Sequence, residues 1–204
     1  VIANNIADIN GGGIFNSGTL SIAGSSIVNN SATANIFFVD QVEGGGGIIN
    51  DQQGSLIIRN STISGNTTSL SGNTSDFFPN GAGGGGILSL GSQLVVINST
   101  IADNSAPLGS GILVSAVENI ETPSRALLQN SIVARNNGSA DIDGFFEPTS
   151  SFNLIGNGNG ILFDGVRNNL AGDIVNPLDP QLSTLQNNGS LTPTYSLLPN
   201  SPAI

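Results

Sequence analysis

The chain has 204 residues and a formal net charge of −10 at neutral pH, and it contains no Cys, Met, His or Trp. It is rich in Gly (28) and Asn (27), and its four basic residues are all Arg. These absences exclude disulfides, thiolate nucleophiles, zinc fingers and histidine bases. The acidic balance argues against a nucleic-acid partner, because phosphates require a basic face. No apolar run approaches the about 20 residues of a membrane span.

One short pattern repeats along most of the chain. In each full copy, Ser stands two residues before an aliphatic residue and Asn stands three residues after it. The aliphatic positions of the four full copies are Ile27, Ile63, Ile101 and Val133. Partial copies at Ile2 and Leu154 bring the apolar-x-x-Asn motif to six occurrences. Repeats of this length indicate a solenoid, in which each turn of the chain packs on its neighbours.

Each repeat is predicted to contain three short β-strands. In the first repeat, they lie near residues 13–16, 20–23 and 26–29. A Gly-rich entry precedes the first strand, and alternating apolar residues mark the second. Along the chain, the Gly-rich entries recur at 44–49, 83–88 and 109–113, and the alternating runs recur at 56–58, 94–96 and 126–128. No window shows a sustained period of 3.6, so almost no helix is expected.

Three short strands per repeat, stacked in register, predict an all-β fold, a right-handed parallel β-helix of about six coils. Equivalent residues of successive coils then lie about 4.8 Å apart. Strand alternation places Ile27, Ile63 and Ile101 in an inward aliphatic column. The Asn residues three positions later, such as Asn30 and Asn66, fall at a corner. There their amides can bond to the next coil and tolerate a left-handed turn.

The coils are expected over residues 1–167 and a cap over residues 168–204. The longer spacings between repeats predict loops on the rim of the solenoid at 31–43, 67–82 and 115–125. The final segment is rich in proline, which cannot donate to a strand ladder. Its prolines are Pro177, Pro180, Pro193, Pro199 and Pro202. We therefore predict an irregular, Pro-rich C-terminal cap that ends the β-helix.

The first coil presents an open strand edge. From Val1 to Ile9 the chain has no proline, and Asp8 is the one charged side chain. Such edges are templates for further strands. We therefore expect the N-terminal edge to meet further repeats of the same polypeptide or another protein.

The Gly-Gly-Gly-Ile entry at 11–14, paired with the apolar-x-x-Asn motif, resembles the repeats of bacterial polymorphic outer membrane proteins and related autotransported surface proteins. Those proteins have right-handed parallel β-helix passengers. The stretch from Asp179 to Ile204 is similar to the end of the choice-of-anchor Q domain of secreted bacterial β-helix proteins, although Asn188-Gly189-Ser190 departs from the usual Asn-Gly-Gly. The resemblance implies an extracellular or cell-surface location, and neither family implies one defined activity.

The sequence lacks a complete catalytic set of the kinds found in carbohydrate-active β-helices. Asp179-Pro180 is followed by Gln181 where the alginate-active enzymes have His, and there is no Asp-Asp pair and no Gly-His-Gly. A glycosidase based on two carboxylates remains open, because it needs only an acid and a partner carboxylate about 5 to 9.5 Å apart. We expect a non-enzymatic, secreted or cell-surface module with a structural or adhesive role.

The alternative is a β-helix that binds or cleaves carbohydrate through its loops. Two of the predicted rim loops carry Phe-Phe pairs with an acid nearby, which could form an aromatic and acidic groove for sugar rings. These candidate ligand-binding residues are Phe37, Phe38, Asp40, Asp76, Phe77 and Phe78. In the competing interpretation, the aromatic pairs pack against the coil wall as small apolar clusters of the loops. Polysaccharide is therefore a candidate partner.

Asp141-Ile142-Asp143-Gly144 places two carboxylates two positions apart before a glycine. Oxygen-rich loops of this kind can hold calcium, so Asp141 and Asp143 are candidate calcium ligands. The competing interpretation is an ordinary solvated loop. No other cofactor is expected.

Overall fold

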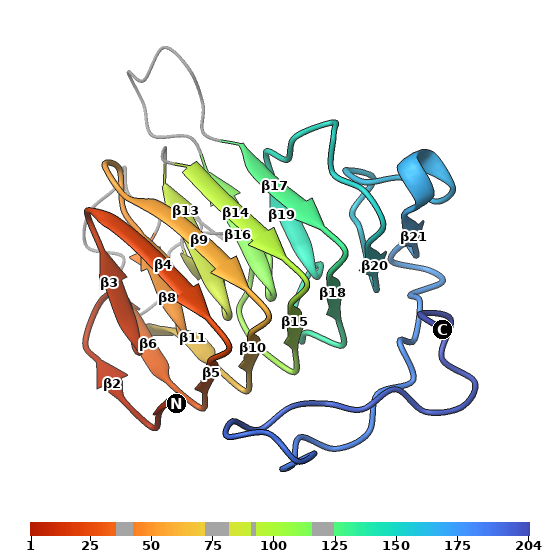
Figure 1. Cartoon of the computed structure of the whole chain (residues 1–204). Coiled ribbons are helices and arrows are strands. Elements are labelled where there is room, and N and C mark those ends of the chain that lie inside the picture. The colour runs from red at the N-terminus through yellow and green to blue at the C-terminus, as the bar shows by residue number, and fades with distance from the viewer. Residues whose placement is uncertain (36–42, 72–81, 91–92, 116–124) are drawn as a thin grey trace.

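The computed structural model describes residues 1–35, 43–71, 82–90, 93–115 and 125–204. It is a right-handed parallel β-helix in which the chain advances coil by coil from the N-terminal end to the C-terminal end (Figure 1). Every pairing between the named strands is parallel. The predicted fold class is confirmed.

Three sheets contain the strands predicted from the sequence. Sheet A stacks β1 (Ile2–Ala3), β5 (Ser26–Val28), β10 (Thr62–Ser64), β15 (Thr100–Ala102), β18 (Ile132–Ala134), β20 (Leu154–Ile155) and β21 (Leu170–Ala171). Sheet C stacks β3 (Ile14–Asn16), β8 (Ile48–Asn50), β13 (Ile87–Leu90), β16 (Ile112–Ser115) and β19 (Ile142–Gly144). Sheet D stacks β4 (Thr19–Ala23), β9 (Ser55–Arg59), β14 (Gln93–Ile97) and β17 (Ala126–Gln129).

Two smaller sheets add strands that the sequence pattern did not indicate. Sheet B stacks β2 (Ile6–Ala7), β6 (Ser31–Asn35) and β11 (Thr67–Ser71), and sheet E pairs β7 (Glu43–Gly44) with β12 (Ala82–Gly83). Strands β6 and β11 thus occupy the first five residues of the segments 31–43 and 67–82, which were predicted as rim loops. In β6 the polar residues alternate with the buried Ala32 and Ala34, but side chains as small as Ala give only a weak apolar signal, so the sequence pattern did not indicate a strand there. Residues 36–42, 72–81 and 116–124 of the predicted loops lie outside the described part of the chain.

The inward aliphatic column of sheet A is confirmed. Ile27, Ile63, Ile101 and Val133 pair in register on successive coils, and none is exposed to solvent. Together with the inward residues of sheets C and D they form one continuous core. Other fully buried members of this core are Ile48, Leu56, Ile58, Ile87, Leu94, Ile112 and Leu128.

The last partial repeat is shifted by one residue from its predicted alignment. The repeat alignment placed Leu154 at the position equivalent to Val133, but Leu154 pairs with Ile132, and Ile155 pairs with Val133. Ile155 therefore fills the inward position. A one-residue change of register exchanges the two faces of a strand, so that the core position goes to the neighbouring side chain. The Asn of this repeat, Asn157, consequently lies one position before the expected corner.

Each of the four central strands of sheet A, β5, β10, β15 and β18, lies between two corners of left-handed backbone. The first corner holds Gly24, Asn60, Asn98 and Asn130, with φ between 47° and 54°. The second holds Asn29, Gly65, Asp103 and Arg135, with φ between 56° and 64°. The sequence analysis assigned the left-handed turn to the following residues, such as Asn30 and Asn66, and that assignment was wrong by one position. The strain of positive φ is smallest for Gly and Asn, which occupy most of these sites.

The C-terminal segment covers more than the end of the β-helix. From residue 172 the chain forms two isolated antiparallel bridges, Leu182 to Leu197 and Gln186 to Thr194, and runs back along the outer face of sheet A (Figure 1). Its Pro193 carbonyl accepts a 2.8 Å hydrogen bond from Ser26 Oγ on β5. Within the described ranges, the one helical element is the short 3-10 turn Val166–Asn168, and no helix is long and apolar enough to cross a membrane.

Candidate functional site

The six residues of the predicted sugar groove lie outside the described part of the chain. Phe37, Phe38 and Asp40 fall within 36–42, and Asp76, Phe77 and Phe78 fall within 72–81. The groove therefore stays a prediction. The described part contains the other candidate residues, Asp141 and Asp143, and two polar networks, one of which includes Asp141.

The corner Asn residues form a hydrogen-bonded column through the coils, which we call the Asn ladder. Its members are Asn5, Asn30, Asn66, Asn104 and Asn136. Each Nδ2 donates to the Oδ1 of the next member at 2.9 Å, and the backbone N–H of the same residue donates to the same oxygen. The predicted coil-to-coil bonding of these amides is confirmed. Buried amides need such partners, because an unpaired polar group in the interior is costly.

Asp141 ends the Asn ladder. Its Oδ1 accepts hydrogen bonds from the backbone N–H of Asn136 at 2.8 Å and from Asn136 Nδ2 at 2.7 Å. Its Oδ2 accepts the backbone N–H of Asn157 at 2.6 Å. Burial raises the pKa of Asp141, and the hydrogen bonds from Asn136 and Asn157 oppose that rise by favouring the charged form. A carboxylate suits this position because donors approach both of its oxygens, whereas an Asn could accept on only one.

Asp143 has a different environment. It lies on β19 opposite Leu113, half-buried, and its Oδ1 accepts the backbone N–H of Gly144 at 2.8 Å and Asn159 Nδ2 at 3.4 Å. Within the described residues, no three acidic side chains are grouped so that they could hold a metal ion. Calcium binding by Asp141 and Asp143 stays a prediction.

A second polar network, which we call the tail latch, consists of Asp103, Arg135 and Tyr195. Arg135 Nε donates to Asp103 Oδ1 at 3.0 Å, and the hydroxyl of Tyr195 donates to Asp103 Oδ2 at 2.6 Å. The guanidinium lies 5.3 Å from the centre of the Tyr195 ring, a cation–π distance. Arg135 also donates to the Leu182 carbonyl at 3.0 Å, and the Tyr195 hydroxyl contacts Ser64 Oγ. The latch therefore fixes the C-terminal segment to three coils.

Burial and the hydrogen bond to Asp103 raise the pKa of Tyr195 to about 12. The bond to Asp103 raises the pKa of Arg135 as well, against the effect of burial. The sequence analysis missed this network. Asp103 and Arg135 occupy equivalent positions, two residues after Ile101 and Val133, so the column alignment could have revealed their ion pair. Tyr195 lies in a segment without repeats, and no sequence signal indicates its partner.

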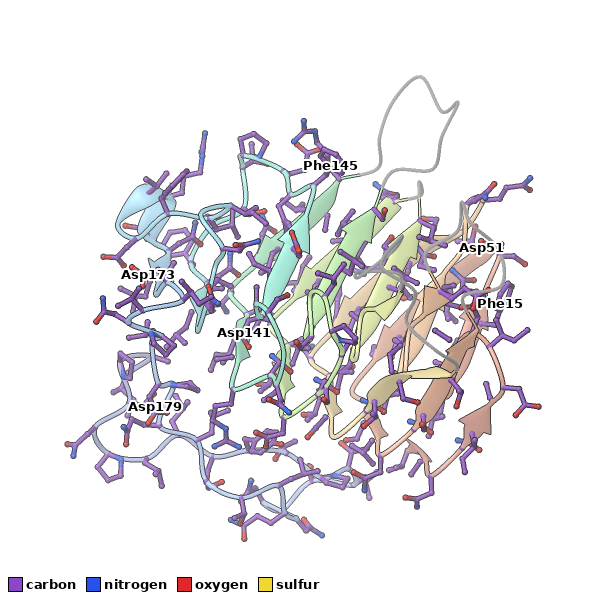
Figure 2. The ribbon with its side chains drawn as sticks, turned by 180° about the vertical axis from the view of Figure 1, so that it is seen from behind. Phe15, Asp51, Asp141, Phe145, Asp173 and Asp179 are labelled. Atoms are coloured by element: carbon purple, nitrogen blue, oxygen red, sulfur yellow. The ribbon has the colours of Figure 1, made fainter. Side chains whose placement is uncertain are left out.

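A cleft of about 610 Å³ lies where the last coils meet the C-terminal segment. Its lining comprises Arg135, Asn136, Asn137, Gly138, Ser139, Ala140, Asp141, Gly156, Asn157, Ile174, Pro177, Leu178 and Asp179. Figure 2 labels Asp141, Asp173 and Asp179 at this end of the molecule. The carboxylate of Asp179 accepts the backbone N–H and the side-chain amide of Gln181, both at 2.9 Å. The three ionisable groups of the lining, Arg135, Asp141 and Asp179, are thus all hydrogen-bonded within the chain.

Comparison of the chain with protein-family models, with curated proteins and with solved structures finds no match. Function is therefore inferred from the Asn ladder, the tail latch and the cleft. In all three, the ionisable side chains form hydrogen bonds with other groups of the protein.

Proposed function

We propose that this chain is a non-enzymatic structural or adhesive β-helix module of a secreted or cell-surface protein. The observation that carries the proposal is that the buried carboxylate of Asp141 accepts structural hydrogen bonds. Asp141 accepts three hydrogen bonds that end the Asn ladder, and Asp179, the second carboxylate of the cleft, is hydrogen-bonded to Gln181. A glycosidase needs two carboxyl groups that face the substrate from either side of the bond to be cleaved.

The composition and the repeat pattern support the same proposal. An acidic, cysteine-free solenoid with stacked Asn residues forms a rigid rod whose stability comes from contacts between neighbouring coils. The resemblance of the Gly-Gly-Gly-Ile entries to the repeats of polymorphic outer membrane proteins favours an extracellular or cell-surface location.

Carbohydrate binding is a second candidate function, and the cleft favours it. Its walls combine the amide of Asn137 with the apolar side chains of Ile174 and Leu178. Clefts that bind small ligands combine an apolar lining with a few polar groups of this kind. A polysaccharide partner is therefore compatible with an adhesive module.

The experiment combines a glycan array with a turnover screen on acidic and neutral polysaccharides, using the full chain. We expect no turnover, and binding to a glycan would support the adhesive role. Turnover that is lost in the Asp76→Asn or the Asp141→Asn variant would overturn the proposal. Asp143→Asn serves as the matched control for Asp141, and Tyr195 fluorescence monitors folding of each variant.

A further inference from the structure

Five Asn-Gly dipeptides lie in the described part of the chain, and the structure holds them to different degrees. At such a dipeptide the glycine nitrogen can attack the Asn side-chain carbonyl, because glycine has no side chain to obstruct the five-membered ring that forms. The attack needs a free glycine N–H and an Asn amide that can rotate onto it. The Asn residues of the five dipeptides are Asn10, Asn137, Asn157, Asn159 and Asn188.

Three of these dipeptides are held at both reacting groups. In the dipeptide at Asn157, the glycine N–H donates to the Gly172 carbonyl at 3.0 Å, and Asn157 Nδ2 donates to the Ser139 carbonyl at 3.0 Å. The dipeptides at Asn10 and Asn188 are held in the same way, each with a bonded glycine N–H and a bonded side-chain amide. Ring closure at these three sites requires the hydrogen bonds to open first.

The dipeptide Asn137-Gly138 is held at neither group. Both residues are exposed, and within the described residues the Asn137 side chain forms no hydrogen bond and the Gly138 N–H donates none. The carbonyl of their shared peptide bond accepts the Ala106 N–H and Ser105 Oγ, both at 3.2 Å. Hydrogen bonds to a carbonyl polarise its peptide group, which makes the Gly138 N–H easier to deprotonate and so favours the attack.

The packing around residue 138 requires glycine. A Cβ at this position would collide with the Ala106 carbonyl oxygen and with Ser110 Oγ. The residue that most favours ring closure is therefore fixed by the fold, next to an Asn whose side chain is free to rotate.

The dipeptide at Asn159 is the nearest competitor. Within the described residues its glycine N–H also donates to no group, but the Asn159 amide donates to Asp143 Oδ1 at 3.4 Å. The surrounding turn is closed by a 2.8 Å hydrogen bond from the Ile161 N–H to the Gly158 carbonyl. Ring closure there has to break the contact with the carboxylate and distort the turn, so we expect Asn159 to react more slowly than Asn137.

We propose that Asn137 is a site of self-modification, at which the folded chain converts this amide to a carboxylate without an enzyme. The Gly138 nitrogen forms a bond to Asn137 Cγ and gives up its proton, and the bond from Cγ to Nδ2 breaks to release ammonia. Water then opens the cyclic imide at either of its two carbonyls, which leaves aspartate or isoaspartate at residue 137. Water is the one co-reactant.

The reaction changes the cleft between the last coils and the C-terminal segment. Asn137 lies in its wall, and conversion adds a negative charge to a cleft that Asp141 and Asp179 also line, in a chain of net charge −10. A ligand that binds the Asn137 amide would therefore bind the freshly made protein better than the aged one. This consequence rests on the proposed carbohydrate binding, whereas the modification itself does not.

The test is incubation of the folded full chain at mildly alkaline pH, followed by brief cleavage after arginine and mass spectrometry. Residues 136–167 form one fragment that contains Asn137, Asn157 and Asn159, so the three sites are compared in the same molecule. We expect a mass gain of one unit at Asn137, about tenfold or more faster than at Asn157, because the bonds that hold Asn157 must open first. A synthetic peptide of residues 136–167 is the unfolded reference and should lose this difference.

Asn137→Gln is the matched variant, because glutamine keeps the amide but would have to close a less favourable six-membered ring. It should abolish the mass gain and keep the β-sheet circular dichroism of the parent. Hydroxylamine attacks the cyclic imide, so it should cut the folded parent after residue 137 and leave this position intact in the variant. Equal rates at Asn137 and Asn157, faster reaction at Asn159, or an Asn137 that reacts in the peptide but not in the folded chain would each overturn the proposal.

Discussion

The two ends of the β-helix are built from the same repeat but finish in different ways. At the N-terminal end, the core residues Ile14 and Leu20 are only partly buried, and Phe15 is 55% exposed on the outer face. At the C-terminal end, Phe146 and Leu162 close the same core and are nearly inaccessible. Figure 2 shows Phe15 at the first end and Asp141 toward the second.

The difference teaches how a solenoid core is closed. Phe146 forms a bridge with Ala126 and so continues the inward column of sheet D formed by Leu20, Leu56, Leu94 and Ala126. The small Ala126 lies next to the large Phe146, so the last member of this column is a side chain wide enough to cover the members below it. Terminal repeats of solenoids commonly depart from the consensus in this way.

Phe146→Ala should have the largest effect, because it removes a buried aromatic ring from the closed end. We expect a loss of about 3–5 kcal/mol in the free energy of unfolding. Phe15→Ala, at the open end, should cost much less, because the ring is already half in water. Denaturant titrations of the two variants measure the difference. Equal losses would show that the two ends are closed equally well.

Ile63→Ala tests the middle of the inward column and should cost about 2–5 kcal/mol. Ile2→Ala removes the same side chain from the same column at the open end, where Ile2 is 36% exposed, and should cost much less. Arg59→Ala, on the outside of β9, should change stability by about 0.5 kcal/mol or less. Chemical denaturation followed by circular dichroism gives all three values. A larger loss for Ile2 than for Ile63 would contradict the description of the open end.

Asp141→Asn tests the end of the Asn ladder and should cost about 1–3 kcal/mol, although the two side chains have nearly the same shape. The Asn amide would direct N–H groups at the N–H of Asn157 or of Asn136. Asp143→Asn is the matched control and should be close to neutral. A neutral Asp141→Asn variant would show that the ladder does not need an acceptor on both oxygens.

The smallest expected effect concerns pH and the tail latch. The chain has one Tyr and no Trp, so phenolate absorbance reports Tyr195 alone. We expect its titration midpoint at about 12, against an ordinary 10.0. Because the pKa is raised in the folded state, the stability from Tyr195 is present below the unfolded pKa and is lost as the pH rises through the folded pKa. Asp103→Asn should lower the midpoint, and an unchanged midpoint would contradict the latch.

Repetition explains how much of this structure could be predicted from the sequence. The positions of Ile63 and Asn66 follow from alignment of the copies, and so does the stacking of their side chains. The alignment failed where a copy was incomplete, since nothing in the sequence distinguished Leu154 from Ile155 as the inward residue. The role of Asp141 was not predicted, because its acidic neighbour Asp143 suggested a metal loop. Asp141 also lies outside the repeated positions, so the alignment could not show its contact with Asn136.

The tail latch also has a consequence for the order of folding. Contacts between neighbouring coils join residues that are close in sequence, whereas the bond between Ser26 and Pro193 joins residues 167 positions apart. Closing so long a loop is entropically costly, and distant contacts form slowly. The C-terminal segment also binds Ser64, Asp103 and Arg135, which belong to later coils, so its docking surface exists only after four coils have stacked. Docking of Tyr195 should therefore be the last kinetic step of folding. Because the docked segment contacts four coils, it should also make these coils unfold cooperatively rather than one by one.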